Sequence, residues 1–452
     1  MLSTRTPTAV LENQRSRLLA LVFLAAFIVQ AAILFIAAPK LGAFLAPEYS
    51  TGFGDLYDLI ANNLVHGNGY RIEANMGETM MREPGYPLFL VLVFKLAGYH
   101  IEAARVANLV LAVGIAFMMM RLTRRVTNDW VTAVIAPLVF LLYPGTLVAE
   151  ARGGVEVAFI FVLMCFMLAL HHAVEKASRW SYFAAGLVLG VVVMVRSTPL
   201  LFPVFLLVYL ASTMRTFRER LKLSLNIVVL VLGMVLVMVP WVIRNYMLVQ
   251  QFVPTATVSG VAAQEGQYTC QAMSRETSFR ASQREAAHER NELASRLGVP
   301  FEGWYYQYFY AARDEVAFNK SLLQKVEMGY ADDPTLLVRC AGKNLFNFWF
   351  LGKTWQATGQ NVLMQVPLLL LTLGGLRLLW KRGRLHEMGI MLTFVLYIIA
   401  VQAPIIAHAR HSIPVVPFLA IPASVALVSI WQAYQRRMPQ GRVEAGLETG
   451  EK

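Results

Sequence analysis

The chain contains repeated apolar runs of about twenty residues, and short clusters of arginine and lysine separate them. A run of that length crosses the hydrocarbon core of a bilayer as an α-helix, since every backbone polar group is then satisfied within the segment. The composition agrees, because 57% of the residues are hydrophobic and only 15% are charged. The sequence therefore predicts an all-α polytopic membrane protein, and it excludes an ordinary soluble domain.

The positively charged residues are distributed along the chain as in a membrane protein, and not as in a nucleic-acid-binding protein. The formal net charge is +12, but the cations stand in short clusters between the apolar runs. This distribution is typical of loops that stay on the cytoplasmic side, and we expect no nucleic-acid partner. The first apolar run, 18–38, is too long for a removable signal peptide, and no small-residue cleavage site follows it.

The basic clusters also predict how many times the chain crosses the membrane. If every cluster is cytoplasmic, an even number of crossings separates each one from the next. The shorter apolar run 86–98 is then re-entrant or interfacial, because counting it as a span would place the Arg121 cluster outside. We expect both termini in the cytoplasm, a position in the inner (cytoplasmic) membrane, and ten transmembrane helices near 18–38, 102–120, 130–148, 155–173, 181–196, 198–213, 224–244, 361–380, 387–407 and 413–432.

This topology divides the chain into five parts. The expected parts are a cytoplasmic tail (1–17), a transmembrane catalytic module (18–244) with an outer loop (39–101), a small outer domain (245–360), C-terminal transmembrane helices (361–432) and a second cytoplasmic tail (433–452). Cys270 and Cys340 both fall in the outer domain. An oxidising compartment permits a disulfide between them, but their spacing alone leaves the pairing open.

The polar segment Gly52–Leu90 stands directly behind the first apolar run. It opens with Asp55 and Asp58 and closes with Arg82 and Glu83, which precede a rigid turn of sequence PGYP. Charged residues held at a membrane surface are costly to place, and they are usually functional. This segment is therefore the first place where we expect chemistry.

Two lone arginines fall on the same expected outer surface. Arg196 interrupts the apolar block 180–210 in the sequence RSTP, where proline disfavours a continuous helix, so two helices should meet there. Arg410 lies in the short outer loop HARHSIPVVP. An arginine fork suits an anionic group such as a lipid phosphate. The alternative is that both side chains simply extend toward lipid headgroups.

The segment GDLYDLIANNLVHGNGY, followed by REPGYPLFL, resembles the first outer loop of bacterial GT-C glycosyltransferases. These are polytopic enzymes related to the protein mannosyltransferase and aminoarabinose transferase families. Further segments resemble the family in the same order, and the likeness runs through nearly all of 52–423. They are LLYPGTLVAEARGGVEVAF, GLVLGVVVMVRSTPLLFP, VPWVIRNYMLVQQFVPTATVSG and HARHSIPVVPFLAIPAS. One departure is His411, where the family commonly has an aromatic residue.

The resemblance implies a reaction and a substrate class. GT-C enzymes move a sugar from a polyprenyl-phosphate-linked donor to a cell-envelope acceptor, which is a lipid, a glycan or a protein, on the outer face. Asp55 falls on the family's acidic position, so it is expected to be the catalytic base or the ligand of an assisting cation. A divalent cation, Mg²⁺ or Mn²⁺, is therefore possible at Asp55, although nothing in the sequence requires a metal.

The other candidate residues follow from the same resemblance and from their places in the outer segments. Glu156 is the second expected catalytic acid, and its structural alternative is to favour a helix N-terminus. Arg196 and Arg410 are expected to hold the donor phosphate, with Arg82 and Arg244 as further candidates. The remaining site candidates are Tyr57, Asp58, Glu83 and His411. For Asp58 we prefer the simpler interpretation, which is that it caps or solvates an amphipathic helix.

A secondary transporter or lipid flippase is the alternative function. Transporters usually show two similar halves and broken helices near the bilayer midplane. Here the halves differ, and the polar residues collect at one surface. A non-catalytic scaffold would leave Asp55, Glu156, Arg196 and Arg410 without a role. The sequence therefore favours the enzyme.

Overall fold

The structure, a computed structural model, describes residues 24, 27–37, 55–273, 279–298 and 309–437. The tail 1–17 and residues 18–23, 25–26 and 38 of the first expected span therefore lie outside the described residues, as do residues 39–54 of the outer loop and 438–452 of the second tail. Within the described residues every regular element is helical and there is no strand. The prediction of an all-α polytopic fold is confirmed.

Among the described residues, six helical segments are long and apolar enough to cross a membrane. They are α5 (Ile101–Thr127), α8 (Val155–Lys176), α11 (Phe217–Val249), α16 (Trp355–Lys381), η4 (Leu385–Met388) with α17 (Gly389–Gln402), and η5 (Ala409–Val415) with α18 (Val416–Arg437). A seventh results if α6 (Trp130–Leu141) and α7 (Pro144–Ala151), bent by 50°, form one broken span. The expected count of ten is not confirmed.

Shorter apolar helices occupy most of the other expected positions. They are α4 (Gly85–Ala97), α9 (Arg179–Val195), and η3 (Thr198–Leu201) with α10 (Phe202–Thr213). The break between α9 and η3 falls at Arg196, as the sequence predicts. From the first expected span, η1 (Ile33–Ala37) and the residues before it are described, and Gln30 Nε2 donates to Glu150 Oε1 of α7 at 2.8 Å.

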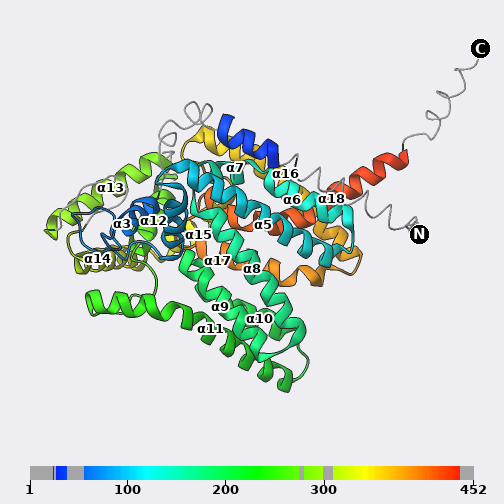
Figure 1. Cartoon of the computed structure of the whole chain (residues 1–452), viewed down its shortest axis with the longest axis horizontal. Helices are drawn as coiled ribbons and strands as arrows, with labels where there is room; N and C mark the ends of the chain where they lie inside the picture. Colours follow the sequence, from blue (N-terminus) through cyan, green and yellow to red (C-terminus); the bar gives the residue numbers. More distant parts are fainter. Residues whose placement is uncertain (1–23, 25–26, 38–54, 274–278, 299–308, 438–452) are drawn as a thin grey trace, which may run out of the picture.

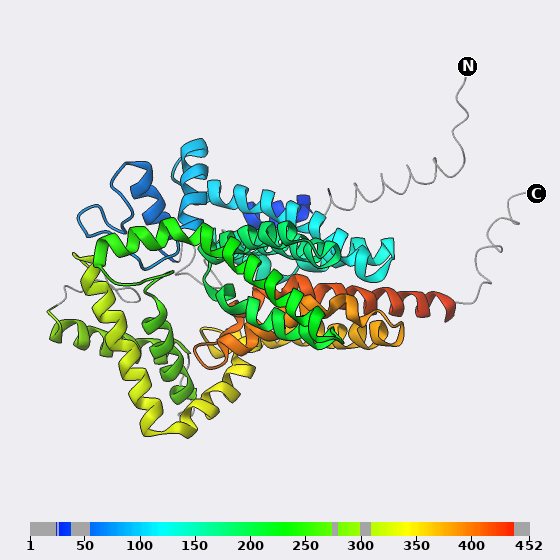
Figure 2. The same ribbon diagram turned by 90° about the horizontal axis from the view of Figure 1, so that it is seen from below.

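The outer segments form a separate set of helices. They are α3 (Tyr57–Val65) in the first loop, and α12 (Ser259–Met273), α13 (Phe279–Arg296), α14 (Ala312–Asp332) and α15 (Pro334–Phe350) in the expected outer domain. A disulfide joins Cys270 of α12 to Cys340 of α15, so the pairing that the sequence left open is present. In Figures 1 and 2, α3 and α12–α14 gather at one end of the molecule, and the last turns of α18 lie at the other.

Basic residues from two clusters meet at that second end. Arg125, in the last turn of α5, pairs with Glu175 near the end of α8 at 2.7 Å and with Glu387 of η4 at 3.8 Å. Arg384 donates from Nη2 to the Arg125 carbonyl at 2.8 Å. These contacts bring together residues of the two basic clusters around Arg125 and Arg384, which the sequence predicts to lie on the same, cytoplasmic side of the membrane. Glu156 begins α8 at the opposite end of that helix.

The first expected outer loop is joined to the expected outer domain through Glu315 of α14. This carboxylate is buried, and it accepts hydrogen bonds from Thr79 Oγ1 at 2.6 Å, from the Met80 N–H at 3.0 Å, and from Thr257 Oγ1. Burial raises the pKa of Glu315, while the hydrogen bonds from the two threonines oppose that shift. These hydrogen bonds hold the loop segment that leads to Arg82 and Glu83.

Candidate active site

Arg410, in the first turn of η5, holds two acids from distant parts of the chain. Its Nη1 donates to Asp55 Oδ1 at 3.2 Å and its Nη2 to Asp55 Oδ2, while its Nε donates to Glu156 Oε1. The Glu156 side chain is 1% exposed, and that of Arg410 is 31% exposed. The structure therefore brings Asp55, Glu156 and Arg410 together in one cluster that is partly accessible to solvent.

Local structure directs both acids toward that cluster. Leu56 has a left-handed backbone conformation (φ 65°). The chain therefore changes direction between Asp55 and the first residue of α3, Tyr57. Glu156 lies in the first turn of α8, directly after a loop that other side chains hold in place. Arg105 Nε donates to the Ala151 carbonyl at 2.7 Å, and Asn108 Nδ2 donates to the Gly154 carbonyl at 3.2 Å.

Arg82 and Glu83 connect the first loop to this site. Arg82 Nε donates to the Asp55 carbonyl at 3.1 Å, and its guanidinium lies 5.0 Å from the centroid of the Tyr57 ring. Glu83 Oε1 accepts the Ser197 N–H at 3.0 Å, beside Arg196. The expected site candidates Arg82, Tyr57 and Glu83 thus surround Asp55 and tie it to the break between α9 and η3.

Arg196 is the cation of this group that has no bound partner. It follows the last turn of α9 and is partly exposed, and its guanidinium forms no hydrogen bond or ion pair with any residue in the described part of the chain. The positive charge of Arg196 nevertheless lowers the pKa of Asp55. Burial raises the pKa of Asp55, but Arg410, Arg82 and Arg196 outweigh it and hold that pKa below its ordinary range. Asp55 is therefore ionised at neutral pH.

Three more basic residues border the site, and none of them stood among the sequence candidates. Burial and the charge of Arg410 lower the pKa of Lys353 to about 8, and the same two causes lower the pKa of His408 to about 3. Burial, followed by Arg410, lowers the pKa of Arg152 to about 10. Arg152 lies inside a segment already quoted for the family resemblance, so that segment could have revealed it. Lys353 stands in no such segment.

Other sequence candidates have different partners. Asp58 accepts a hydrogen bond from the Tyr99 hydroxyl at 2.8 Å and is buried, so it is not the solvated side chain that we expected, and no side-chain hydrogen bond caps the start of α3. Arg244 pairs with Glu78 at 3.1 Å and donates to the Thr79 carbonyl at 2.8 Å. Neither residue forms a hydrogen bond or ion pair with Arg410 in the described structure.

His411 lies beside the site. Its ring centroid is 3.9 Å from that of His408, and its buried Nδ1 has no hydrogen-bond partner among the described residues. The possible divalent cation at Asp55 stays a prediction. In the described residues both Asp55 carboxylate oxygens face Arg410, and no group of three or more His, Cys, Asp or Glu side chains is arranged to hold a metal.

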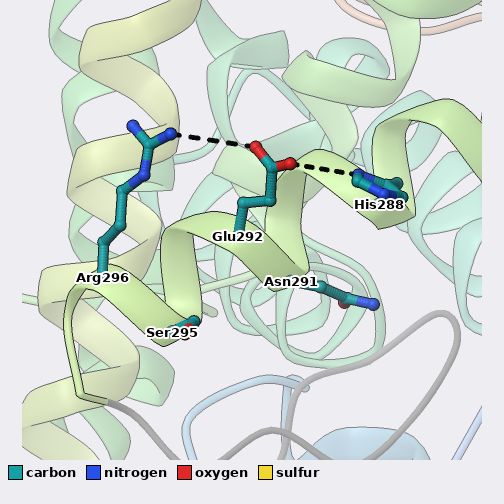
Figure 3. A pocket seen from close by; sticks show the side chains of 5 residues that line it. All are labelled: His288, Asn291, Glu292, Ser295 and Arg296. Atoms are coloured by element: carbon teal, nitrogen blue, oxygen red, sulfur yellow. Dashed lines mark ion pairs between the residues drawn. The ribbon is translucent and has the colours of Figure 1, made fainter.

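A shallow pocket on α13 is a different kind of feature (Figure 3). Its lining side chains are His288, Asn291, Glu292, Ser295 and Arg296. All five come from the exposed face of one helix, where Glu292 pairs with His288 at 3.5 Å and with Arg296 at 3.9 Å. Such pairs one turn apart are typical of a solvated helix surface. We therefore do not assign the pocket to the site around Arg410.

The comparisons with known proteins give one family match and several weak structural likenesses. Residues 82–243 match the family described as dolichyl-phosphate-mannose-protein mannosyltransferase. No curated protein matches the chain. Crystal structures of ArnT from Cupriavidus metallidurans resemble it in the state bound to undecaprenyl phosphate (TM-score 0.36, 15% identity, 90% of this chain and 81% of that one) and in the apo state (TM-score 0.37, 17% identity, 95% and 81%).

TM-scores of this size carry no argument, so only the family match over residues 82–243 bears on function. The matched range contains Arg82, Glu83, Glu156 and Arg196, which are four of the candidate site residues. It also contains four of the helical segments of the membrane bundle that are described above, α5, α8, α9 and α10. Over residues 82–243, about a third of its length, the chain is therefore similar to the dolichyl-phosphate-mannose-protein mannosyltransferase family.

Proposed function

We propose that this protein transfers a sugar from a polyprenyl-phosphate-linked donor to a cell-envelope acceptor at the outer face of the inner membrane. The observation that carries the proposal is the pairing of Asp55 and Glu156 on Arg410, with Arg196, which has no partner among the described residues, nearby. An ionised carboxylate and an available guanidinium are the two groups that such a transfer needs. The family match is to transferases, which favours this function over a transporter or lipid flippase.

Arg196 and Arg410 are the proposed ligands of the donor phosphate. A guanidinium fork fits two phosphate oxygens, and such charge-assisted hydrogen bonds are stronger than neutral ones. The same groups would stabilise the charge that develops on the leaving oxygen, because they are already oriented in a partly dry site. Arg82 is bound to the Asp55 carbonyl and to the face of Tyr57, so we assign it to positioning Asp55.

Asp55 is the proposed base. It is ionised at neutral pH, so it can accept the proton of the acceptor as the new bond forms. While Arg410 is paired with it, Asp55 is a weak base, because a neighbouring cation stabilises the ionised form. A donor phosphate that draws Arg410 away would make Asp55 more basic. Glu156, which is almost fully buried, would keep hold of Arg410 Nε during this change.

Two observations support an outer-face site. The Cys270–Cys340 disulfide lies in the domain that adjoins the first loop, and disulfides persist in oxidising compartments. The basic clusters around Arg125 and Arg384 lie at the opposite end of the helices, as expected for cytoplasmic loops. The site and the clusters would then face opposite sides of the membrane.

The test compares two neighbouring acids in the purified, full-length protein. Mass spectrometry of envelope glycans from cells with and without the gene first identifies the sugar and the acceptor. Asp55→Asn should then lower transfer from the lipid-linked sugar by about a hundredfold or more. Asp58→Asn, which alters only the contact with Tyr99, should keep most of the activity. Full activity in both variants would remove Asp55 from the mechanism. A parent protein that releases no lipid phosphate would refute the proposed function.

A further inference from the structure

The chain segment that carries Arg196 is anchored on both sides of that residue. Arg196 follows the last turn of α9 with an extended backbone (φ −156°, ψ 123°), and η3 begins at Thr198. A break of this kind removes intrahelical partners from nearby backbone groups. Irregular backbone at membrane depth is tolerated only where other groups of the protein, or water, satisfy it. Side chains from two other elements supply such partners here.

The first anchor comes from the expected first outer loop. Glu83 Oε1 accepts the Ser197 N–H at 3.0 Å, and the Glu83 side chain is buried. The Tyr70 hydroxyl donates to the Glu83 carbonyl at 3.1 Å, so the backbone of Glu83 is itself held. A Cβ atom added at Gly85 would lie 2.7 Å from the Met194 carbonyl oxygen. The loop therefore also packs directly against the last turn of α9.

The second anchor is Tyr397 of α17, which lies in none of the sequence segments that marked the site. Its hydroxyl donates to the Thr198 carbonyl at 2.5 Å and accepts the Leu201 N–H at 3.1 Å. The Tyr397 side chain is fully buried, and its ring centroid lies 5.6 Å from that of Phe202 and 5.0 Å from that of Phe205. The hydroxyl group therefore ties η3 to α17, and the ring contacts fix where it does so.

Arg196 lies between these anchors, yet its guanidinium forms no hydrogen bond or ion pair with any described residue. A fixed backbone and an unengaged guanidinium fork suit anion binding, because less conformational freedom is lost when the anion binds. We infer that Tyr397 is a positioning residue, which holds the start of η3 so that Arg196 is directed toward the donor phosphate. This inference rests on the proposed function and adds a residue that sets donor affinity without contacting the donor.

The experiment measures lipid binding to the full-length protein in nanodiscs. The probes are a polyprenyl phosphate, which requires no knowledge of the sugar, and the uncharged polyprenol. Tyr397→Phe removes the hydroxyl and keeps the ring contacts. It should weaken polyprenyl phosphate binding about three- to tenfold and leave polyprenol binding unchanged. The matched control is Tyr182→Phe near the start of α9, because the Tyr182 side chain is also buried but its hydroxyl forms no hydrogen bond with the described residues.

A double-variant cycle shows whether Tyr397 acts through Arg196. In an Arg196→Ala background, Tyr397→Phe should change polyprenyl phosphate binding by less than about twofold, because the group that it positions is gone. If Tyr397 only stabilised the helix bundle, Tyr397→Phe would weaken binding by the same factor in both backgrounds, and the inference would be overturned.

Two further replacements of Tyr397 keep the volume of the hydroxyl, so that a cavity cannot explain their effects. Para-aminophenylalanine still donates a hydrogen bond to the Thr198 carbonyl, and it should bind polyprenyl phosphate as the parent protein does. Para-fluorophenylalanine donates none, and it should bind as Tyr397→Phe does. Equal binding by these two variants would contradict the inference even if Tyr397→Phe failed to fold.

The outcomes separate this inference from the proposed function. If the parent protein binds polyprenyl phosphate no better than polyprenol, the proposed function itself fails. If the parent prefers the phosphate and Tyr397→Phe binds it equally tightly, the role of Tyr397 is refuted and the proposed function stands. Parent-level binding by Arg196→Ala would also refute the inference, because Arg196 would then not be a ligand that needs positioning.

Discussion

At the scale of single residues, Arg410 and Arg196 differ in their ion pairs. Arg410 is paired with two carboxylates, one of which is almost fully buried. Removing it would leave Asp55 and Glu156 unpaired, and breaking a buried pair of this kind costs about 3–5 kcal/mol of stability. Loss of activity in an Arg410 variant would therefore mix folding with function. Arg196 has no such partner among the described residues, so it gives the cleaner test.

We predict that Arg196→Ala lowers donor binding or turnover about ten- to hundredfold, which corresponds to one charge-assisted hydrogen bond in a partly dry site. The thermal midpoint should stay close to that of the parent protein, because no described residue loses a partner. Arg196→Lys should restore only part of the loss, since an ammonium cannot bind two phosphate oxygens as a fork does. Turnover of the lipid-linked sugar by purified protein is the measurement. Parent-level turnover in Arg196→Ala would indicate an arginine that only reaches toward lipid headgroups.

At the scale of elements, the position of Arg196 depends on how closely α9 packs against α11. A Cβ atom added at Gly186 of α9 would lie 2.0 Å from the Leu230 carbonyl oxygen of α11. One added at Gly233 of α11 would lie 2.5 Å from the Phe183 carbonyl oxygen of α9. Within a bilayer no hydrophobic force drives helices together, so small residues that allow close backbone contact are a main source of stability.

Gly186→Ala should therefore force the two helices apart. Overpacking of this kind typically costs about 1–3 kcal/mol, so we expect a lower thermal midpoint, measured by size-exclusion chromatography after heating. Donor turnover should fall as well, because the end of α9 carries Arg196. The control is Gly359→Ala in α16, where an added Cβ meets nothing within 4 Å. Equal thermal midpoints for the two variants would show that the α9–α11 contact tolerates the extra carbon.

At the scale of the whole molecule, the site joins the first outer loop, the starts of α8 and η5, and the end of α9. The hydrogen bonds of Glu315 and the disulfide between α12 and α15 stabilise the expected outer domain beside it. The basic clusters occupy the other end of the helices. This separation gives a prediction about the orientation of the protein in the membrane.

Cysteines placed at the two ends of α16 should differ in their access to an impermeant thiol reagent. In a Cys165→Ser background, Gly359→Cys should react when the reagent is added to cells whose outer permeability barrier has been opened. Lys381→Cys should react only after the inner membrane is disrupted. Cys165 is the one free thiol in the described chain, which is why the background removes it. The reverse pattern would invert the topology and place the site on the cytoplasmic side.

The sequence by itself determined the membrane class, the order of the helices, the break at Arg196 and most of the candidate residues. These properties depend on local signals, such as the length of an apolar run or a proline after an arginine, which act within a few residues along the chain. Family resemblance added the expected catalytic acid and the arginines expected to bind phosphate, before any contact was known.

Only the tertiary structure decided which of these residues meet. Asp55 and Glu156 reach Arg410 across 355 and 254 positions of sequence, while Asp58, three residues from Asp55, pairs with Tyr99 instead. Lys353 joins the site although no motif marks it, and Cys270 pairs with Cys340 although spacing left that open. Such pairings depend on how helices pack and on where their ends fall in three dimensions. Packing is a property of the whole bundle, so no local pattern could predict it.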